Sequence, residues 1–343
     1  MWIEVVGGSR HVPAPGSFVS AHRWTEVTVS ARMVLRRLGG GLLVLWLVSI
    51  LTFLLVQLIP GDPAEVIAGE NATVEEVARI RTELGLGQPV LEQYLNWFSG
   101  ILRGDMGDSL FTNRSVATTI AEAAPPTVVI TTMAILVAVV IGVTAGIAAG
   151  LTQGSWIDRA VSAAATLGIA MPSFWLAMVL VSVFALTNPW LPATGYVDVR
   201  SGFGVWLSHV ILPATALGLA TAAELARHTR GCVADVLTRP YVRTARARGA
   251  SGVWLIRRHI LRNAAIPVVT VLGLQTGRLL GGAIVVEAVF GISGLGSLAI
   301  NSVLQRDYPM IQGYVLFSAV VVVAINLIVD LAYGWINPKV RTA

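Results

Sequence analysis

Few side chains in this sequence have the type and spacing that catalysis or metal binding requires. Cys232 is the single cysteine, which excludes an internal disulfide and a multi-cysteine metal site. The five histidines are scattered, with no HExxH motif and no close pair that could hold zinc. No GxxxxGKS/T loop occurs, so the chain is not expected to bind ATP through a Walker A motif. The sequence therefore predicts no catalytic residue, no metal site and no bound cofactor in this chain.

Positive charge is concentrated in one stretch, between residues 239 and 262. These 24 residues contain no carboxylate and seven arginines, namely Arg239, Arg243, Arg246, Arg248, Arg257, Arg258 and Arg262. Arginine at this density cannot lie in hydrocarbon, so the stretch is expected in water, on the side of a membrane where positive loops collect.

Gly249 divides this basic stretch into two halves, at a turn that is expected to need a positive φ. Residues 242–248 are compatible with a helix. After the glycine, Ser251 can cap a second short helix, in which Val253 and Ile256 recur at helical spacing. Two short helices joined by a turn would form a compact unit at a membrane surface, which is typical of a docking element.

Arg278 is an arginine near the middle of a long apolar segment. A central arginine costs roughly 2.5–3.5 kcal/mol, so it is expected to face a bundle interior, a partner or a wet cavity. Two interpretations stay open: it lines a pathway, or it forms a structural ion pair with a neighbouring subunit. Glu287 is nine residues further on, about 13 Å along a helix and on the opposite face, so it is not the expected partner.

Four polar residues near the apolar segments are expected to have ordinary structural roles. Glu287 falls near the outer interface, where solvation explains it. Glu224 and Asp330 are expected at the cytoplasmic ends of their segments, also solvated. His209 lies among apolar residues and is expected to make a hydrogen-bonded helix contact rather than to bind a ligand.

Long apolar blocks must position all of these residues. Hydrophobic residues form 55% of the chain and charged residues 13%, whereas soluble domains carry roughly 25% charge. Because a helix rises 1.5 Å per residue and hydrocarbon is about 30 Å thick, the blocks predict six transmembrane helices. The expected spans are residues 33–59, 127–151, 160–187, 201–225, 265–289 and 308–333, with a kink at Pro172. The predicted fold class is an all-α integral membrane protein.

Three polar segments lie outside these spans. Residues 1–32 are expected to form a cytoplasmic tail, and residues 226–264 a cytoplasmic loop that contains the basic stretch. Residues 60–126 are expected to form an extracytoplasmic insert with helices over 73–84 and 90–102. Thr73 and Glu76 have the spacing of a capping box at the start of the first of these helices, and Gly85 closes it.

The distribution of basic residues predicts the orientation in the membrane. With the N-terminus inside, the inner segments hold 17 of the 24 Lys and Arg residues, the outer segments hold six, and Arg278 lies within a span. This excess is what the positive-inside rule predicts. Both termini and the basic stretch are therefore expected in the cytoplasm. The pI near 9.9 does not indicate a nucleic-acid partner, because the basic residues flank membrane segments.

The basic stretch resembles the cytoplasmic EAA loop of ABC-importer permease subunits. In that family a glycine follows an EAA-like triplet by three residues. Here Arg243, Thr244 and Ala245 occupy the triplet positions and Gly249 is the glycine. The wording YVRTARARG and RHILRNA, together with the tetrapeptide PGDP after the first apolar block, is similar to the B-type subunit of the dipeptide, oligopeptide and nickel branch. The resemblance covers residues 33–340.

The resemblance implies a function, a set of partners and a coupling site. The chain would be the inner-membrane subunit that forms half of a pathway for di- or oligopeptides, with nickel or a glutathione-like peptide as the alternative cargo. Its partners would be a second homologous permease subunit, two cytoplasmic ATPases that bind ATP and Mg, and an extracytoplasmic solute-binding protein. The residues implied to contact the ATPase are Arg243, Thr244, Ala245, Gly249, Val253, Trp254 and Ile256. The family mechanism is alternating access driven by ATP on the partners.

A self-sufficient secondary transporter is the alternative from another class. Such transporters commonly have inverted repeats and acidic residues at mid-span for ion coupling. The sequence has no evident repeat and no carboxylate near the middle of a span. The permease interpretation is therefore favoured.

Overall fold

The computed structural model describes residues 31–58, 62–69, 72–83, 85–249, 252 and 261–336. Every regular element in those ranges is a helix, apart from an isolated β-bridge between Asp108 and Ser115. The expectation of an all-α protein is confirmed for this part of the chain. Residues 1–30 of the predicted tail lie outside the described ranges.

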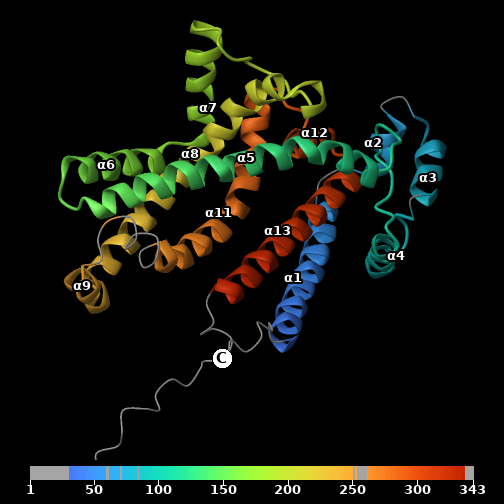
Figure 1. The fold of residues 1–343 in the computed structure, drawn as a ribbon. Coiled ribbons are helices and arrows are strands. Elements are labelled where there is room, and N and C mark those ends of the chain that lie inside the picture. The colour runs from blue at the N-terminus through green and yellow to red at the C-terminus, as the bar shows by residue number, and fades with distance from the viewer. Residues whose placement is uncertain are drawn as a thin grey trace, which may run out of the picture.

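Along the chain, the helices form an N-terminal group and a longer C-terminal group, and α1 of the first group lies beside α13 of the second (Figure 1). The first group comprises α1 (Ala31–Gln57), α2 (Pro63–Ala68), α3 (Val74–Glu83) and α4 (Val90–Leu102). The second comprises α5 (Val116–Leu151), α6 (Trp156–Ala170), α7 (Ser173–Val181) with the π-helical turn η1 (Ser182–Thr187), the short 3₁₀ turn η2 (Val199–Ser201), α8 (Phe203–Thr238), α9 (Pro240–Ala247), α11 (Leu261–Val289), α12 (Leu295–Gln305) and α13 (Tyr308–Ile336). Figure 1 places α9 and the helices α2–α4 at opposite ends of the long helices.

Four helices in the described ranges are long and apolar enough to cross a membrane. They are Leu35–Gln57 of α1, Val116–Leu151, Phe203–Thr238 and Tyr308–Val329 of α13. Two bent pairs bring the number to six if each forms one span: α6 with Ser173–Thr187, bent by 102°, and the two parts of α11, bent by 46°. The first bend confirms the kink predicted at Pro172, because proline cannot continue the hydrogen-bond ladder of α6.

Two of the long helices extend beyond the spans expected from the sequence. The span expected from residue 127 belongs to a helix that begins at Val116, and the span expected to end at residue 225 continues to Thr238. Hydropathy marks only the part of a helix that can lie in hydrocarbon, whereas backbone hydrogen bonds continue into water. The polar extension of α8 carries α9 away from the apolar part of the bundle.

The centre of the molecule is the parallel packing of α5 against α8. A Cβ atom on Gly146 would lie 2.6 Å from the carbonyl oxygen of Ala226, and one on Gly150 would lie 2.7 Å from Cβ of Val233. Gly142 lies against Ala222 in the same way, so three glycines four residues apart allow the two backbones to approach. Small residues have this role where lipid gives no hydrophobic drive for association. The C-terminal end of α5 is thereby fixed beside the end of α8 that leads to α9.

The N-terminal group confirms the local predictions made for the insert. The backbone N–H and the hydroxyl of Thr73 donate to Glu76 at 2.9 and 3.1 Å, and the N–H of Glu76 donates back to the hydroxyl at 3.3 Å. These bonds form the capping box of α3. Gly85 follows the helix with a φ of +66°, and α4 has the predicted bounds. The hydrogen bonds that the Glu76 carboxyl accepts from Thr73, chiefly from its backbone N–H, also hold the pKa of Glu76 below its usual value.

Candidate translocation and coupling site

Three of the predicted coupling residues, Arg243, Thr244 and Ala245, lie on α9, which packs against the C-terminal end of α8 beside the end of α5. Val242 is fully buried in a small cluster with Val233 of α8, and Ile147 of α5 and Ala245 of α9 pack against it. Arg243 lies on the exposed side of the same helix. α9 is therefore amphipathic: one face joins the bundle and the other presents charge outward.

Gly249 has the backbone conformation that the sequence analysis required of the turn after α9. Its φ is +84°, in the left-handed region that favours glycine, and no atom lies within 4 Å of a Cβ placed on it. The positive-φ turn is confirmed, and no neighbour among the described residues crowds it. Val253, Trp254 and Ile256 lie outside the described residues, so the second half of the predicted docking unit stays a prediction.

An ion pair that the sequence analysis did not identify fixes the loop between α5 and α6 to α8. Arg230 donates through Nε to Oδ1 of Asp158, and through Nη2 to Oδ2 at 2.8 Å. The backbone N–H of Gly154 donates to Oδ2 at 2.9 Å, and the hydroxyl of Ser155 caps α6. Only 6% of the Asp158 side chain is exposed. In the sequence, the start of α6 could have been recognised from Ser155 and Asp158, which have the three-residue spacing of a helix N-cap and its partner.

Arg278 pairs with a carboxylate of its own chain, which neither open interpretation named. Its Nη1 lies 3.7 Å from Oε2 of Glu224 on α8, and Gln275 donates an N–H to the same oxygen. The expectation that Glu224 is solvated at a helix end is wrong, because α8 continues to Thr238 and only 24% of the Glu224 side chain is exposed. The Arg278 side chain is 77% exposed in the isolated chain, so the pair presents its positive end outward from the chain.

Glu287 is fully buried, which corrects the expectation that it is solvated at the outer interface. The hydroxyl of Thr127 on α5 donates to Oε1 at 2.5 Å, and the N–H groups of Gly296 and Ser297 donate to Oε2 at 2.7 and 3.3 Å. The N–H of Leu295 donates in turn to the Thr127 hydroxyl at 2.8 Å. One carboxylate therefore caps the first turn of α12 from the end of α11, where unpaired N–H groups favour negative charge.

The glycines of the segment GISGLG make this capping possible. A Cβ atom on Gly294 would lie 2.6 Å from the Glu287 carboxylate, and one on Gly296 would lie 2.4 Å from Cα of Ile284. Gly291 has a φ of +58° and turns the chain back from α11. The sequence analysis did not connect these glycines with Glu287. The signal was a lone acid a few residues before a glycine-rich turn.

A second buried carboxylate joins the N-terminal group to α13. Asp307 accepts a hydrogen bond from the hydroxyl of Ser109 at 2.5 Å and from the N–H of Leu110 at 3.3 Å. It also accepts from the N–H of Met310 in the first turn of α13, at 3.4 Å. Asp307 thus connects the loop before α5 to the N-terminal end of α13, which begins at Tyr308.

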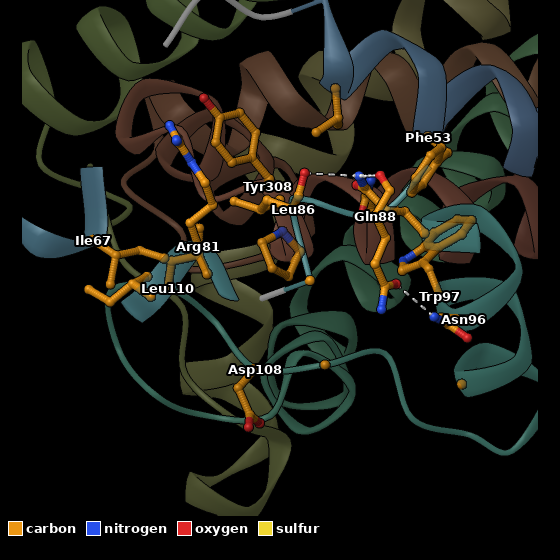
Figure 2. Close-up of a pocket in the computed structure, with 18 of the residues that line it drawn as sticks. Phe53, Ile67, Arg81, Leu86, Gln88, Asn96, Trp97, Asp108, Leu110 and Tyr308 are labelled. Atoms are coloured by element: carbon orange, nitrogen blue, oxygen red, sulfur yellow. Dashed lines mark hydrogen bonds between the residues drawn. The ribbon is translucent and has the colours of Figure 1, made fainter. Parts of the chain in front are cut away.

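A recess of about 1320 Å³ lies among the outer end of α1, the helices α3 and α4, and the start of α13 (Figure 2). Arg81, which pairs with Asp62, lies on one side of it, and Phe53 and Trp97 lie on the other. The hydroxyl of Tyr308 is buried and has no hydrogen-bond partner in the described part of the chain. Side-chain amides line much of the remaining wall: Gln57, Gln88, Gln93, Asn96 and Gln312. The recess can hold water or a polar chain.

The described residues contain no cluster of metal-ligating side chains. No three His, Cys, Asp or Glu side chains there lie close enough to hold a metal ion. Nδ1 of His209 lies 2.8 Å from the carbonyl oxygen of Val205, which confirms the predicted contact within its helix.

These features define a class of protein: a polytopic helical membrane subunit with a basic amphipathic helix at one end and an ion pair between two of its long helices. Two family models match the chain. The model described as binding-protein-dependent transport system inner membrane component matches residues 142–342, and the model for the N-terminal part of such membrane components matches residues 30–131. The chain belongs to this family, the inner-membrane permease subunits of ABC importers. The resemblance of the chain to that family is thereby confirmed.

Curated relatives cover nearly the whole chain. A probable peptide ABC transporter permease protein, y4tP of Sinorhizobium fredii, is 39% identical over 308 residues, which are 90% of this chain and 98% of the relative. The glutathione transport system permease protein GsiC of Escherichia coli K12 is 44% identical over the same coverage. In fold, the chain is similar to one in the inward-facing MetNI methionine ABC transporter, with a TM-score of 0.52, 18% identity, and coverage of 64% of this chain and 96% of that one.

Proposed function

We propose that this permease subunit forms one half of the translocation pathway for di- or oligopeptides. The observation that carries the proposal is the full-length similarity to a probable peptide permease and to a glutathione permease. Glutathione is itself a short peptide, so both relatives are named for cargo of one chemical class. A glutathione-like peptide is the second candidate cargo, favoured by the 44% identity to the glutathione permease.

The partners proposed are those of a complete importer. A second homologous permease subunit would supply the other half of the pathway, two cytoplasmic ATPases would bind ATP and Mg, and a solute-binding protein would deliver cargo from outside. The orientation proposed places both termini and α9 in the cytoplasm. The excess of basic residues in those segments supports it. The helices α2–α4 would then face the binding protein.

The proposed coupling site is α9 together with the turn at Gly249 and residues Val253, Trp254 and Ile256. Because Val242 is buried with Val233 of α8 in a cluster against which Ile147 of α5 also packs, a movement imposed on α9 by the ATPase would be transmitted to both helices. The Asp158–Arg230 pair links the start of α6 to the same end of α8. Three helices would therefore move as one body, which suits alternating access.

The proposed role of Arg278 is to line the pathway. Its guanidinium is exposed in the isolated chain while Glu224, 3.7 Å away, compensates its charge. Peptides carry a terminal carboxylate, which an exposed arginine with a weakly held partner can bind in passing. Lining residues of this kind need only modest affinity, since the binding protein selects the cargo.

Reconstitution tests this function. The chain would be purified with the second permease subunit and ATPases encoded beside it, reconstituted into proteoliposomes and supplied with the cognate binding protein. Uptake of a labelled dipeptide or of glutathione is expected only with ATP and the binding protein. Uptake driven by a proton or sodium gradient without ATP would show that the chain is a secondary transporter instead.

A further inference from the structure

The helix α4 belongs to the segment predicted to be an extracytoplasmic insert, yet it packs beside a membrane-spanning part of α1. The hydroxyl of Tyr94 lies 2.9 Å from Oγ of Ser49, a buried residue of α1. The Phe53 ring lies 5.5 Å from that of Tyr94 and 5.7 Å from that of Trp97, measured between centroids. Ser49 and Phe53 are eight and four residues before Gln57, the end of α1, and therefore about 12 and 6 Å below it.

The level of these contacts sets the depth of α4. The apolar span Leu35–Gln57 has 23 residues, only slightly more than about 30 Å of hydrocarbon requires. A helix that contacts α1 at Phe53 and reaches Ser49 therefore lies at the outer boundary of the hydrocarbon, not above it. The amide of Gln93 reaches Gln57 at 3.2 Å, which marks the upper edge of the contact.

The sequence of α4 is amphipathic, as a helix at the boundary of the hydrocarbon must be. At 100° per residue, Leu91, Leu95 and Leu102 fall within a 40° arc, and Tyr94 and Phe98 border it on the side of α1. These leucines are 67, 53 and 73% exposed in the isolated chain. The arc next to the leucines, on the side away from Tyr94, is polar and consists of Glu92, Asn96 and Ser99, with Arg103 just after the helix.

The exposed leucines continue a surface that already faces lipid. Along the outer half of α1, Leu47, Leu51 and Leu55 are each more than half exposed. In Figure 1, α4 is seen nearly end-on beside the upper half of α1, which runs obliquely across the view, so the two helices are not parallel. A helix that crosses the outer end of a span in this way can lie along the membrane surface.

We propose that α4 is an interfacial helix that rests on the outer leaflet of the bilayer and braces α1. Its leucine arc enters the boundary between acyl chains and headgroups, its aromatic residues lie against α1, and its polar arc faces water and the recess. Interfacial helices of this kind sit about 5–10 Å into that boundary. Tyr and Trp favour the same level, because their rings are apolar and carry one polar group.

Accessibility of single spin labels tests the proposal. Leu95→Cys and Glu92→Cys, each in a Cys232→Ser background, would be labelled in the full-length chain within its purified complex, in nanodiscs of phosphatidylcholine and phosphatidylglycerol. Leu47→Cys on α1 provides the lipid reference and Glu75→Cys on α3 the aqueous reference. The label at 95 is expected to collide with oxygen more than with a water-soluble nickel chelate, as at 47. The label at 92 is expected to match 75.

Two results would overturn the assignment. If position 95 matches position 75, α4 stands in water. If position 95 is inaccessible to both reagents, a protein partner covers it. Leu91→Cys, labelled with a bimane fluorophore and exposed to lipids brominated near the headgroup, repeats the measurement at a second site. Strong quenching at 91 and weak quenching at 92 are expected, and equal quenching at both would contradict the proposal.

Discussion

The capping of α12 by Glu287 can be tested by removing the carboxylate. In Glu287→Ala the N–H groups of Gly296 and Ser297 lose their acceptor in a buried site. Each buried donor left unpaired costs about 1–3 kcal/mol, so the substitution is expected to lower the free energy of unfolding by about 2–6 kcal/mol. The Thr127 hydroxyl loses its acceptor as well, which places the expectation in the upper part of that range.

The matched variant Glu287→Gln separates the hydrogen bonds from the volume of the side chain. Its amide oxygen can still accept from Gly296 and Ser297, and its NH₂ group can donate to Thr127, so a loss of about 1 kcal/mol is expected. Gly281→Ala on the same helix is the control, because a Cβ there meets nothing within 4 Å. It is expected to be neutral or slightly stabilising.

Stability would be measured on the purified protein by denaturation with SDS in mixed micelles, followed by circular dichroism, with the midpoint of thermal unfolding as a second observable. The expected order is Gly281→Ala and wild type, then Glu287→Gln, then Glu287→Ala. An alanine variant as stable as the wild type would refute the reasoning, since it would mean that the N–H groups of α12 do not depend on this carboxylate.

Four further predictions follow from other parts of the chain. Gly146→Ala forces a Cβ against α8 and is expected to cost about 1–3 kcal/mol of unfolding free energy in the same assay, whereas Gly231→Ala, which has open space, is expected to be neutral. Gly249→Val, at a φ of +84°, is expected to abolish ATP-driven uptake in proteoliposomes without loss of membrane insertion. Arg278→Gln is expected to reduce uptake most for cargo with a free carboxylate, with normal subunit stoichiometry in the purified complex. Folding lowers the pKa of Glu76, so its carboxylate stabilises α3 at pH values above the ordinary pKa of 4.5. This stabilisation is lost as the pH falls through the lower pKa of the folded state. Amide hydrogen exchange in α3, measured against pH, should report the loss.

Each of these predictions has an outcome that would contradict it. Equal stability of the Gly146 and Gly231 variants would mean that α5 and α8 separate at no cost. Full uptake by the Gly249 variant would exclude the turn from coupling. A complex of the Arg278 variant that falls apart would assign the arginine to assembly rather than to the pathway. A Glu76→Gln variant whose α3 keeps the wild-type pH dependence would place the titrating group elsewhere.

The class of protein could be predicted from the sequence, because the signals involved are local. Long uncharged blocks, a proline at position 172 and a basic stretch without carboxylates each report on their own segment. The capping box at Thr73 and the positive φ at Gly249 are also local, since a backbone conformation or a hydrogen bond three residues away depends on nearby residues alone. The helical blocks, the bend at Pro172, the capping box and the positive φ of Gly249 were confirmed in the described part of the chain, whereas the placement and role of the basic stretch stay predictions. The extents of α5 and α8 were not predicted, since hydropathy does not mark where a helix ends in water.

The partners of the charged side chains depend on how distant helices pack, and the sequence alone did not predict them. Glu224 and Glu287 were both expected to be solvated, and both are held by groups far away in the sequence. Distances along a single helix showed that Arg278 could not reach Glu287, but they could not show that α8 brings Glu224 beside it. The same limit applies to Asp158 and Arg230, which are 72 residues apart and meet only because α6 and α8 pack together. A charged side chain near an apolar segment can be solvated, paired with an opposite charge or buried among hydrogen-bond donors, and the packing of distant helices selects one of these arrangements.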